Sequence, residues 1–286
     1  MPTRGSKALR TISWDRVAAY AGFAVLSVVV LLPVYWIVRS SLANTRDLIT
    51  TPLVYFPRPT LRNYYTLVEQ VPFLQYIRNS LVFAIATTLA TLVVSYLAAY
   101  AFARIQLRFS GILMWSLVLS MALPDVGTIV PLYQVLKNLR MLDSIAGITL
   151  VLSSTLTPFT VWVLVSFIRQ VPYEIEEAAI IDGASLLRVF WHILLPVTMP
   201  GLVTMGLINF INAWNNLLYP LSFTTSPSAK TLSVAITEVF AGYSPWGKPW
   251  ELIMAVGVTM TVPVVILVMA SQRAIVRGLI AGAIKA

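Results

Sequence analysis

The sequence contains no cysteine and only one histidine among its 286 residues. Without cysteine, the chain can form neither a disulfide framework nor a cysteine-ligated metal site. Charge is scarce as well, because Asp, Glu, Lys and Arg make up 11% of the chain, about half of their share in a soluble domain. One histidine and eleven acidic residues also argue against a metalloenzyme. These scarcities point away from soluble enzymes and towards a protein that lies in a lipid bilayer.

The chain is instead rich in long apolar segments, and 58% of its residues are hydrophobic. A helix needs about 20 predominantly apolar residues to span a bilayer, and an open chain satisfies its backbone hydrogen bonds in lipid only as a helix. The third charge-free segment is short and Pro131 follows it, so we expect a re-entrant or lateral piece there. The predicted fold is an all-α polytopic membrane bundle. Its six transmembrane helices are expected in the windows 17–38, 79–103, 109–124, 144–168, 197–219 and 252–272.

The predicted organisation along the chain follows from these windows. The first window, 17–38, exceeds the apolar core of a signal peptide, which has about 7–15 residues, so we expect an uncleaved first transmembrane helix. It follows a basic tail at residues 1–16 and precedes an external loop at residues 39–74. The main transmembrane domain is expected at residues 75–275, with a second tail at residues 276–286. Six spans place both termini on the same side.

The density of Lys and Arg favours cytosolic termini, because the cytosolic ends of membrane helices carry an excess of these residues. The external segment 39–78 also carries five arginines, which opposes this trend. The two tails and the turn after the second window nevertheless have the highest density of Lys and Arg. Their basic residues are Arg4, Lys7, Arg10, Arg16, Arg104, Arg108, Arg273, Arg277 and Lys285. We therefore attribute the net charge of +9 to membrane topology and not to a nucleic-acid surface.

Two external segments have distinct compositions. Residues 125–143 have apolar side chains at helical spacing, which is typical of an amphipathic helix along the membrane interface. Residues 223–251 are rich in aromatic and turn-forming residues, and we expect a loop there. Such a loop suits a protein contact, but an interfacial belt of aromatic residues explains the composition equally well.

The only cluster of acidic residues lies in residues 174–196, which we call the elbow. Gly183 should end a first helix there, because glycine tolerates the left-handed backbone of many helix termini. Ser185 can cap a second short helix, and Pro196 suits the first turn of the next long helix. The first half of the elbow has residues at helical spacing: Ile175, Ala178, Ala179 and Asp182. The sequence thus predicts an exposed helix–Gly–helix segment that is suited to docking.

The elbow also matches a known pattern. Glu177-Ala178-Ala179, Gly183, Ile193 and Leu195-Pro196 stand at the spacing of the EAA loop, so the chain resembles the permease subunits of ATP-binding-cassette (ABC) importers. The surrounding chain resembles the carbohydrate-uptake branch, that of maltose-type permeases, and the likeness extends over residues 75–286. The stretches that carry it are Asn79-Ser-Leu with Ala98 through Arg104, Asn212-Ala-Trp-Asn215, and Gln272 through Ala283.

The resemblance implies a non-catalytic subunit that binds no cofactor itself. ATP and magnesium would be bound by a dimer of separate ABC ATPase subunits. A second homologous permease subunit would complete the pathway through the lipid bilayer, and an external solute-binding protein would deliver cargo, with residues 223–251 as its expected contact. The implied location is the bacterial cytoplasmic (inner) membrane. The implied cargo is a sugar or oligosaccharide, with sugar phosphates, peptides and amino acids as alternatives.

The resemblance further implies that the elbow docks on the ATPase and passes its movement to the membrane helices. The residues expected to carry this coupling are Glu174, Glu177, Ala178, Ala179, Asp182, Gly183, Ile193, Leu195 and Pro196.

A polar stripe in the fifth window is a candidate substrate path. Asn209, Asn212 and Asn216 are spaced as i, i+3 and i+7, and polar side chains within a membrane often face a water-filled path or a partner helix. Amides suit sugar hydroxyls, and the rings of Trp214 and Tyr219 suit the apolar faces of a pyranose. Amide bonding between helices, without any substrate contact, explains the stripe equally well. The carbohydrate branch commonly has an acid where Asn216 stands, which weakens that assignment.

Two rival functions have little support in the sequence. Residues 242–248 have the G-x4-G-K spacing of a phosphate-binding loop, but Pro249 follows instead of a Ser or Thr and no strand precedes it. An ion-coupled carrier would need buried acids and usually an internal repeat, and the predicted helices contain almost no acids.

Overall fold

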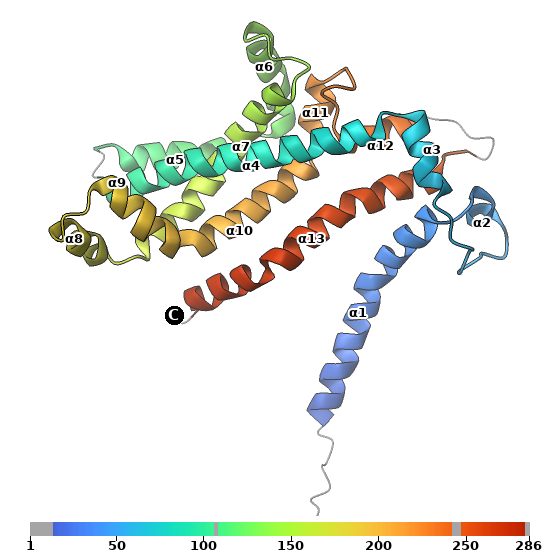
Figure 1. Cartoon of the computed structure of the whole chain (residues 1–286), viewed down its shortest axis with the longest axis horizontal. Coiled ribbons are helices and arrows are strands. Elements are labelled where there is room, and N and C mark those ends of the chain that lie inside the picture. Colours follow the sequence, from blue (N-terminus) through green and yellow to red (C-terminus); the bar gives the residue numbers. More distant parts are fainter. Residues whose placement is uncertain (1–13, 106–107, 242–246, 284–286) are drawn as a thin grey trace, which may run out of the picture.

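The computed structural model describes residues 14–105, 108–241 and 247–283, and the protein is all-α (Figure 1). Its helices are α1 (Trp14–Ser41), α2 (Thr45–Ile49), α3 (Arg62–Gln70), α4 (Phe73–Arg104), α5 (Ser110–Ser120), α6 (Asp125–Asn138), α7 (Ile145–Arg169), α8 (Tyr173–Ile181), α9 (Leu186–Val189), a π-helical turn (Phe190–Leu194), α10 (Leu195–Trp214), α11 (Leu218–Phe223), α12 (Leu232–Ala241) and α13 (Trp250–Ala283).

Five of the described helices are long and apolar enough to cross a membrane: α1, α4, α7, α10 together with the turns before it, and α13. The pair α5 and α6 would make a sixth span, but it is bent by 104°. This bend agrees with the expected lateral piece after the third window. The fifth window, 197–219, contains most of α10, which begins at Leu195 and ends at Trp214, before Asn216. The side chain of Asn216 instead accepts a hydrogen bond from the backbone N–H of Tyr219 at 3.1 Å, at the start of α11.

Helices α4, α7 and α10 form the centre of the bundle, and α13 packs against α10 (Figure 1). Two apolar clusters hold this centre together. One surrounds Trp214 and Tyr219 near the outer loops, and the other surrounds Phe190 and Leu194 near the elbow. Helix α4 contributes Phe83 to the first cluster and Tyr96 to the second, so it runs through both.

The long helices differ in their proline content. Prolines lie inside α1, α7, α10 and α13 at positions 33, 158, 200 and 263. Helix α4 is 32 residues long and has none. An internal proline removes a backbone hydrogen bond and commonly kinks a helix. An unbroken helix of this length extends about 48 Å at 1.5 Å per residue.

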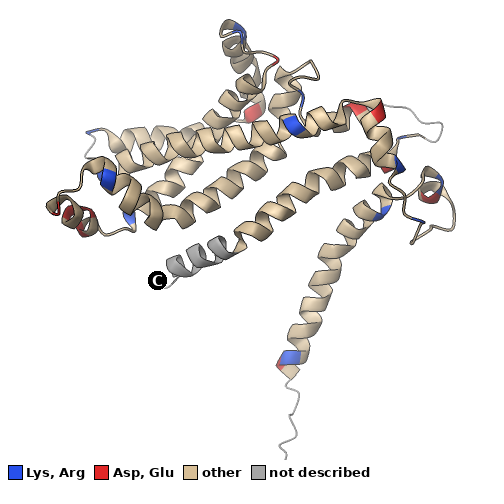
Figure 2. Cartoon of the chain, viewed as in Figure 1, with Lys and Arg blue, Asp and Glu red and all other residues tan. Residues whose placement is uncertain are grey.

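Charged residues lie at the ends of the central helices (Figure 2). The middle of α4, α7 and α10 carries none, as a lipid environment requires.

The segments that connect the long helices contain more helix than expected. The predicted loop at residues 39–74 contains two helices, α2 and α3, and the predicted loop at residues 223–251 contains α12. Buried side chains such as Leu232 and Ala235 explain the second difference, because they give α12 an apolar face against the core.

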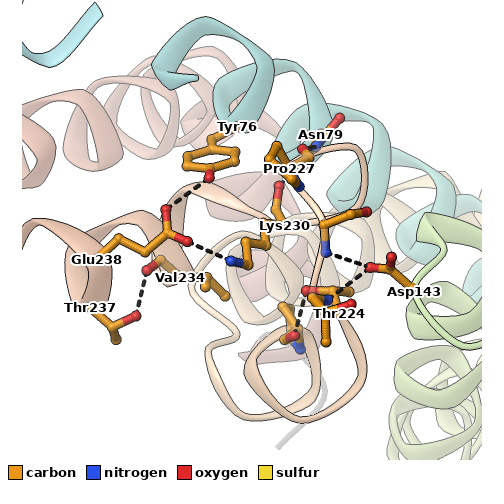
Figure 3. A network of polar contacts seen from close by, with 12 residues as sticks. Tyr76, Asn79, Asp143, Thr224, Pro227, Lys230, Val234, Thr237 and Glu238 are labelled. Carbon is orange, nitrogen blue, oxygen red and sulfur yellow. Dashed lines mark hydrogen bonds and ion pairs between the residues drawn. The ribbon is translucent and has the colours of Figure 1, made fainter. Parts of the chain in front are cut away.

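The loop between α11 and α12 is attached to α4 by hydrogen bonds (Figure 3). The Asn79 amide donates to the carbonyls of Pro227 and Lys230 at 3.0 and 2.8 Å. The Ser80 hydroxyl accepts from the backbone N–H of Leu232 at 2.7 Å. The Asn79-Ser-Leu stretch therefore fixes the loop between α11 and α12 to the start of α4.

The same loop is held on its other side by Asp143. Its carboxylate accepts from the backbone N–H groups of Thr225 and Ser226 at 2.8 and 2.9 Å. Partial burial opposes ionisation, but these donors outweigh it and hold the pKa of Asp143 below its ordinary value. The Glu238 carboxylate accepts from the Tyr76 hydroxyl and from Lys230, at 2.8 and 2.6 Å (Figure 3). We call these contacts, together with those of Asn79 and Ser80, the outer network.

Replacing Asn79 by leucine should destabilise the protein by about 1–3 kcal/mol, because two carbonyls in partly buried contacts lose the donor of a buried amide while the side-chain volume is roughly kept. Thermal unfolding of the detergent-solubilised protein measures the effect. The control is Asn215→Leu, since the exposed Asn215 amide bonds to the nearby Ile211 carbonyl at the end of α10 and not to another element of the described chain; its effect should stay within about 0.5 kcal/mol. Equal stability of the two variants would contradict the assigned role of Asn79.

Candidate functional site

The first arm of the elbow ends at Gly183, as predicted. Gly183 has a φ of +85°, which is the left-handed region. Its N–H donates to the carbonyl of Ile180 at 3.0 Å, and the N–H of Ala184 donates to that of Ala179 at 2.9 Å. These two bonds form a Schellman motif, which pairs carbonyls that a helix end leaves free. The motif reverses the chain between α8 and α9.

The second arm begins at Ser185, whose hydroxyl accepts from the backbone N–H of Arg188 at 3.4 Å and caps α9. A π-helical turn then joins α9 to α10, with the N–H of Leu195 donating to the carbonyl of Phe190. Pro196 stands in the first turn of α10, as predicted. No pattern in the sequence indicated the π-helical turn, whose residues apart from His192 are apolar.

Aromatic contacts fix this second arm to the bundle. The ring of Phe190 lies 5.1 Å from that of Tyr96 and 5.4 Å from that of Tyr100, measured between centroids. Leu194 is fully buried in the same cluster. The predicted coupling residues Ile193 and Leu195 flank it and are half-buried, while Pro196 is exposed.

The acids of α8 divide into two groups. Glu174, Glu177 and the following Asp182 are exposed, as the docking interpretation requires. Glu176 belongs to the same acidic cluster but does not share this exposure, because its side chain is only 3% exposed. Of the remaining predicted coupling residues, Ala178 and Gly183 are exposed and Ala179 is half-buried.

The buried Glu176 forms an ion pair with Arg104. Its Oε1 accepts from Nε of Arg104, the last residue of α4, at 2.6 Å. Nη2 of Arg104 donates to the carbonyls of Ile168 and Val171 at 3.0 and 2.7 Å, at the end of α7 and just after it. The Arg104 side chain is 9% exposed. Sequence spacing could not reveal this contact, since the two residues are far apart along the chain.

Large apolar side chains are exposed at the tip of the elbow. Ile181 is 84% exposed and Leu187 is 68% exposed, and Leu186 beside it is similar. These residues flank Gly183 on both arms, and we call Ile181, Leu186 and Leu187 the apolar tip. Together with the exposed acids they form a surface of mixed apolar and negative character. Such a surface is suited to a protein contact.

The second predicted site, the polar stripe, is not a single face. Asn209 is buried, and its amide donates to the Thr160 hydroxyl of α7 at 3.2 Å. Asn212 is exposed and bonds to the Ile208 carbonyl of its own helix. Asn216 lies beyond the end of α10. The structure therefore separates the three amides, and of these three Asn212 alone has an exposed side chain.

Trp214 and Tyr219 lie in the core. The Trp214 ring is 1% exposed, stacks on Phe210, and donates its N–H to the Met260 carbonyl at 2.8 Å. The Tyr219 hydroxyl donates to Asp125 at 3.0 Å, at the start of α6. Neither ring has an open face in this structure, so both serve helix packing here.

Two further expectations concern bound groups. Residues 242–246, which hold most of the G-x4-G-K spacing, lie outside the described residues, as do residues 1–13 of the basic tail and residues 284–286. Within the described part of the chain, no three His, Asp or Glu side chains come close enough together to hold a metal ion.

The chain is similar to known transport proteins. The family described as binding-protein-dependent transport system inner membrane component matches residues 92–281. The sulfoquinovosyl glycerol transport system permease protein of Agrobacterium fabrum is 34% identical over 256 residues, which cover 89% of each chain. The trehalose/maltose transport system permease protein of Thermococcus litoralis is 32% identical and covers 94% of this chain and 97% of its own.

A solved structure has the same fold. A chain of a bacterial ABC transporter involved in the import of the acidic polysaccharide alginate superposes with a TM-score of 0.77. The superposition covers 96% of this chain and 99% of that one, at 18% sequence identity. The family match identifies the chain as a transport-system inner membrane component, and its arrangement of helices is the one found in this solved transporter chain.

Proposed function

Because this chain belongs to the family of binding-protein-dependent transport system inner membrane components, we infer that it is the permease subunit of an ATP-driven importer that moves a sugar or oligosaccharide across the cytoplasmic membrane. The observation that carries this inference is the match to sugar-system permeases along almost their whole length. The chain is a multi-pass membrane protein, with five long apolar helices and one bent pair among its described residues.

The proposed assembly contains a second homologous permease subunit, a dimer of ABC ATPase subunits and an external solute-binding protein. ATP and magnesium belong to the ATPases, and this chain performs no covalent chemistry. Helix α1 supports the need for a membrane partner, because its only residues buried within this chain are Arg39, Ser40 and Ser41. For the solute-binding protein we propose a contact within residues 223–251, where the outer network holds the loop between α11 and α12.

We propose the elbow as the site of ATPase docking. Exposed Glu174, Glu177 and Asp182 supply negative charge, and Ala178 and Gly183 permit close approach. Ala179, Ile193, Leu195 and Pro196 then join the docked arm to the bundle and to α10. The apolar tip adds a contact that the sequence pattern does not include.

The proposed substrate path passes Asn212, whose amide is exposed on α10. Asn209 and Trp214 support this helix from behind through Thr160 and Met260. Asn216 and Tyr219 fix the turn at its outer end. In this proposal the amide of Asn212 pairs with sugar hydroxyls, while the other four residues position it.

We also propose that both termini and the elbow face the cytosol. The start of α1, the end of α13 and the elbow all lie away from the end of the bundle that carries α2 and α3 (Figure 1). The absence of cysteine permits a direct test, since Leu187→Cys would carry the only thiol. A membrane-impermeant maleimide should label it in inside-out vesicles and leave it unlabelled in right-side-out vesicles. The reverse pattern would contradict this topology and with it the docking role.

The transport function is tested by reconstituting the complete complex in liposomes with its solute-binding protein and a panel of radiolabelled mono- and disaccharides. We expect uptake of at least one sugar that depends on ATP. Uptake driven by a proton or sodium gradient without ATP would contradict the inference, and uptake of peptides alone would contradict the proposed cargo.

Replacing Ile181 by aspartate should weaken ATPase docking by about tenfold, because burial of one large apolar side chain is worth about 1.5–3 kcal/mol and the new charge repels the neighbouring acids. Copurification of the ATPase with the permease measures this loss. Ile181→Val is the matched control and should retain the ATPase. If the aspartate variant copurifies the ATPase at the original level, the apolar tip is not part of the contact.

A further inference from the structure

The Arg104 guanidinium joins three elements at one point. Its Nε bonds to Glu176 of α8, and its Nη2 bonds to the carbonyls of Ile168 and Val171 at and beyond the end of α7. The Tyr173 ring lies 5.7 Å from its Cζ, which adds a cation–π contact from the first residue of α8. Carbonyls at a helix end have no partner within the helix, and a cation is favourable there. Arg104 therefore caps α7 while it binds α8.

Burial distinguishes this ion pair from ordinary surface pairs. The two side chains are 9% and 3% exposed. Removing two charges from water is costly, and losing one partner of a buried pair leaves the other charge uncompensated. Docking does not explain the orientation of Glu176, because the other acids of the elbow point to solvent. A separate role is required for this one inward-facing carboxylate.

The chain connectivity shows what the pair adds. The elbow is joined covalently to α7 at its start and to α10 at its end, so a force on the elbow reaches these two helices through the backbone. Helix α4 has no backbone connection to the elbow. Its Tyr96 and Tyr100 contact the second arm at Phe190, and the Arg104–Glu176 pair adds a contact between the last residue of α4 and the first arm.

Helix α4 then leads to the opposite end of the bundle. It is free of proline along 32 residues, and its outer half carries Tyr76, Asn79 and Ser80, all members of the outer network. One unbroken helix thus bears the contact with the elbow at one end and the contacts with the external loop at the other.

We propose that Arg104 and Glu176 are positioning residues that make α4 move with the elbow, so that ATPase movement reaches the external loop through α4 as well as through α7 and α10. This proposal rests on the proposed importer function. It assigns to the pair a role in coupling and not in docking, because neither side chain reaches the exposed surface of the elbow.

The test uses the complete complex reconstituted in liposomes, with ATP hydrolysis and sugar uptake measured on the same vesicles. Glu176→Gln should keep ATP hydrolysis and lower uptake, so that the ATP consumed per sugar rises about tenfold, as for the loss of a coupling free energy between two sites. Arg104→Lys should give a smaller rise, because one ammonium cannot hold three acceptors in the planar geometry of a guanidinium. Arg169→Gln, which removes an exposed cation from the same end of α7, is the control and should leave the ratio unchanged.

The possible outcomes distinguish a failure of the proposed importer function from a failure of the coupling role of Arg104 and Glu176. If the unmodified complex shows no ATP-dependent uptake, the proposed function fails. If it transports normally and Glu176→Gln leaves the ratio of ATP to sugar unchanged, or lowers hydrolysis and uptake in parallel, the coupling role of the pair is wrong.

A second measurement remains available if Glu176→Gln assembles poorly. The cysteine-free chain permits spin labels at Ile105→Cys and Ile175→Cys, two exposed positions at the end of α4 and on α8. With the pair intact, we expect one narrow distance distribution that is the same without nucleotide and with bound ATP. Arg104→Lys should broaden it and make it depend on nucleotide. If the distance between the labels depends on nucleotide while Arg104 and Glu176 are both unchanged, the proposal is overturned.

Discussion

Replacing Gly183 by glutamate is expected to abolish sugar uptake while the protein still inserts into the membrane. The left-handed φ of +85° costs a side-chain-bearing residue about 1–2 kcal/mol. A glutamate there also adds a negative charge beside Glu177 and Asp182. A distorted Schellman motif would turn α9 away from α8, and the ATPase would meet a different surface. Uptake by the reconstituted complex, together with the amount of permease in the membrane fraction, measures both parts of this expectation.

Two control variants at this position separate backbone from charge. A Cβ built on Gly183 meets no atom within 4 Å, so steric overlap plays no part. Asparagine tolerates the left-handed conformation, and Gly183→Asn should keep most of the uptake. Gly183→Ala should fall between the asparagine and glutamate variants. Undiminished transport by Gly183→Glu would count decisively against coupling through the elbow.

Replacing Gly147 by alanine should give the largest loss of stability among small substitutions. Gly147 lies in the first turn of α7, and an added Cβ would stand 2.1 Å from the Met141 carbonyl oxygen. Because this oxygen belongs to the backbone, no side-chain rotation can relieve the overlap. Residues 140 and 143, in the connection between α6 and α7 that also holds Met141, have positive φ angles of 54°, so this connection has little freedom to adjust. We expect a destabilisation of about 2–3 kcal/mol, as for overpacking of a close-packed site.

Thermal unfolding in detergent measures this loss, and Gly111→Ala provides its control. A Cβ at Gly111 in α5 meets nothing within 4 Å. Alanine there should stabilise the helix by about 0.5–1 kcal/mol, because glycine is the weaker helix former. If Gly147→Ala unfolded at the temperature of the unmodified protein, the close approach of Met141 to α7 would have to be absent in solution.

Much of the fold could be predicted because lipid imposes simple rules. Charge-free windows located the long helices, and the short third window with Pro131 after it indicated the bend between α5 and α6. The outer segments were less predictable. Their helices, such as α12, are stabilised by burial against α4 and α13, which a local pattern does not contain.

The elbow illustrates the same limit at single residues. Gly183, Ser185 and Pro196 act locally, and their roles followed from backbone preferences alone. Glu176 could not be placed, because the helical spacing of Ile175 and Ala178 predicts a helix but does not show which of its faces is buried. In the structure that stripe is exposed, and an ion pair with a residue of another helix buries the acid instead. Trp214 was misjudged for a similar reason, since its partner Met260 belongs to α13.

The π-helical turn at Phe190–Leu194 helps to determine the direction in which the elbow points relative to α10. Each residue of an α-helix rotates the chain by about 100°, and a π-helical turn holds one residue more than an α-helical turn. Without that additional residue, α9 would swing around the axis of α10 by roughly this angle. Leu187 would then point in a different direction around that axis. The direction in which this subunit presents its docking surface is therefore encoded by residue count as well as by residue identity.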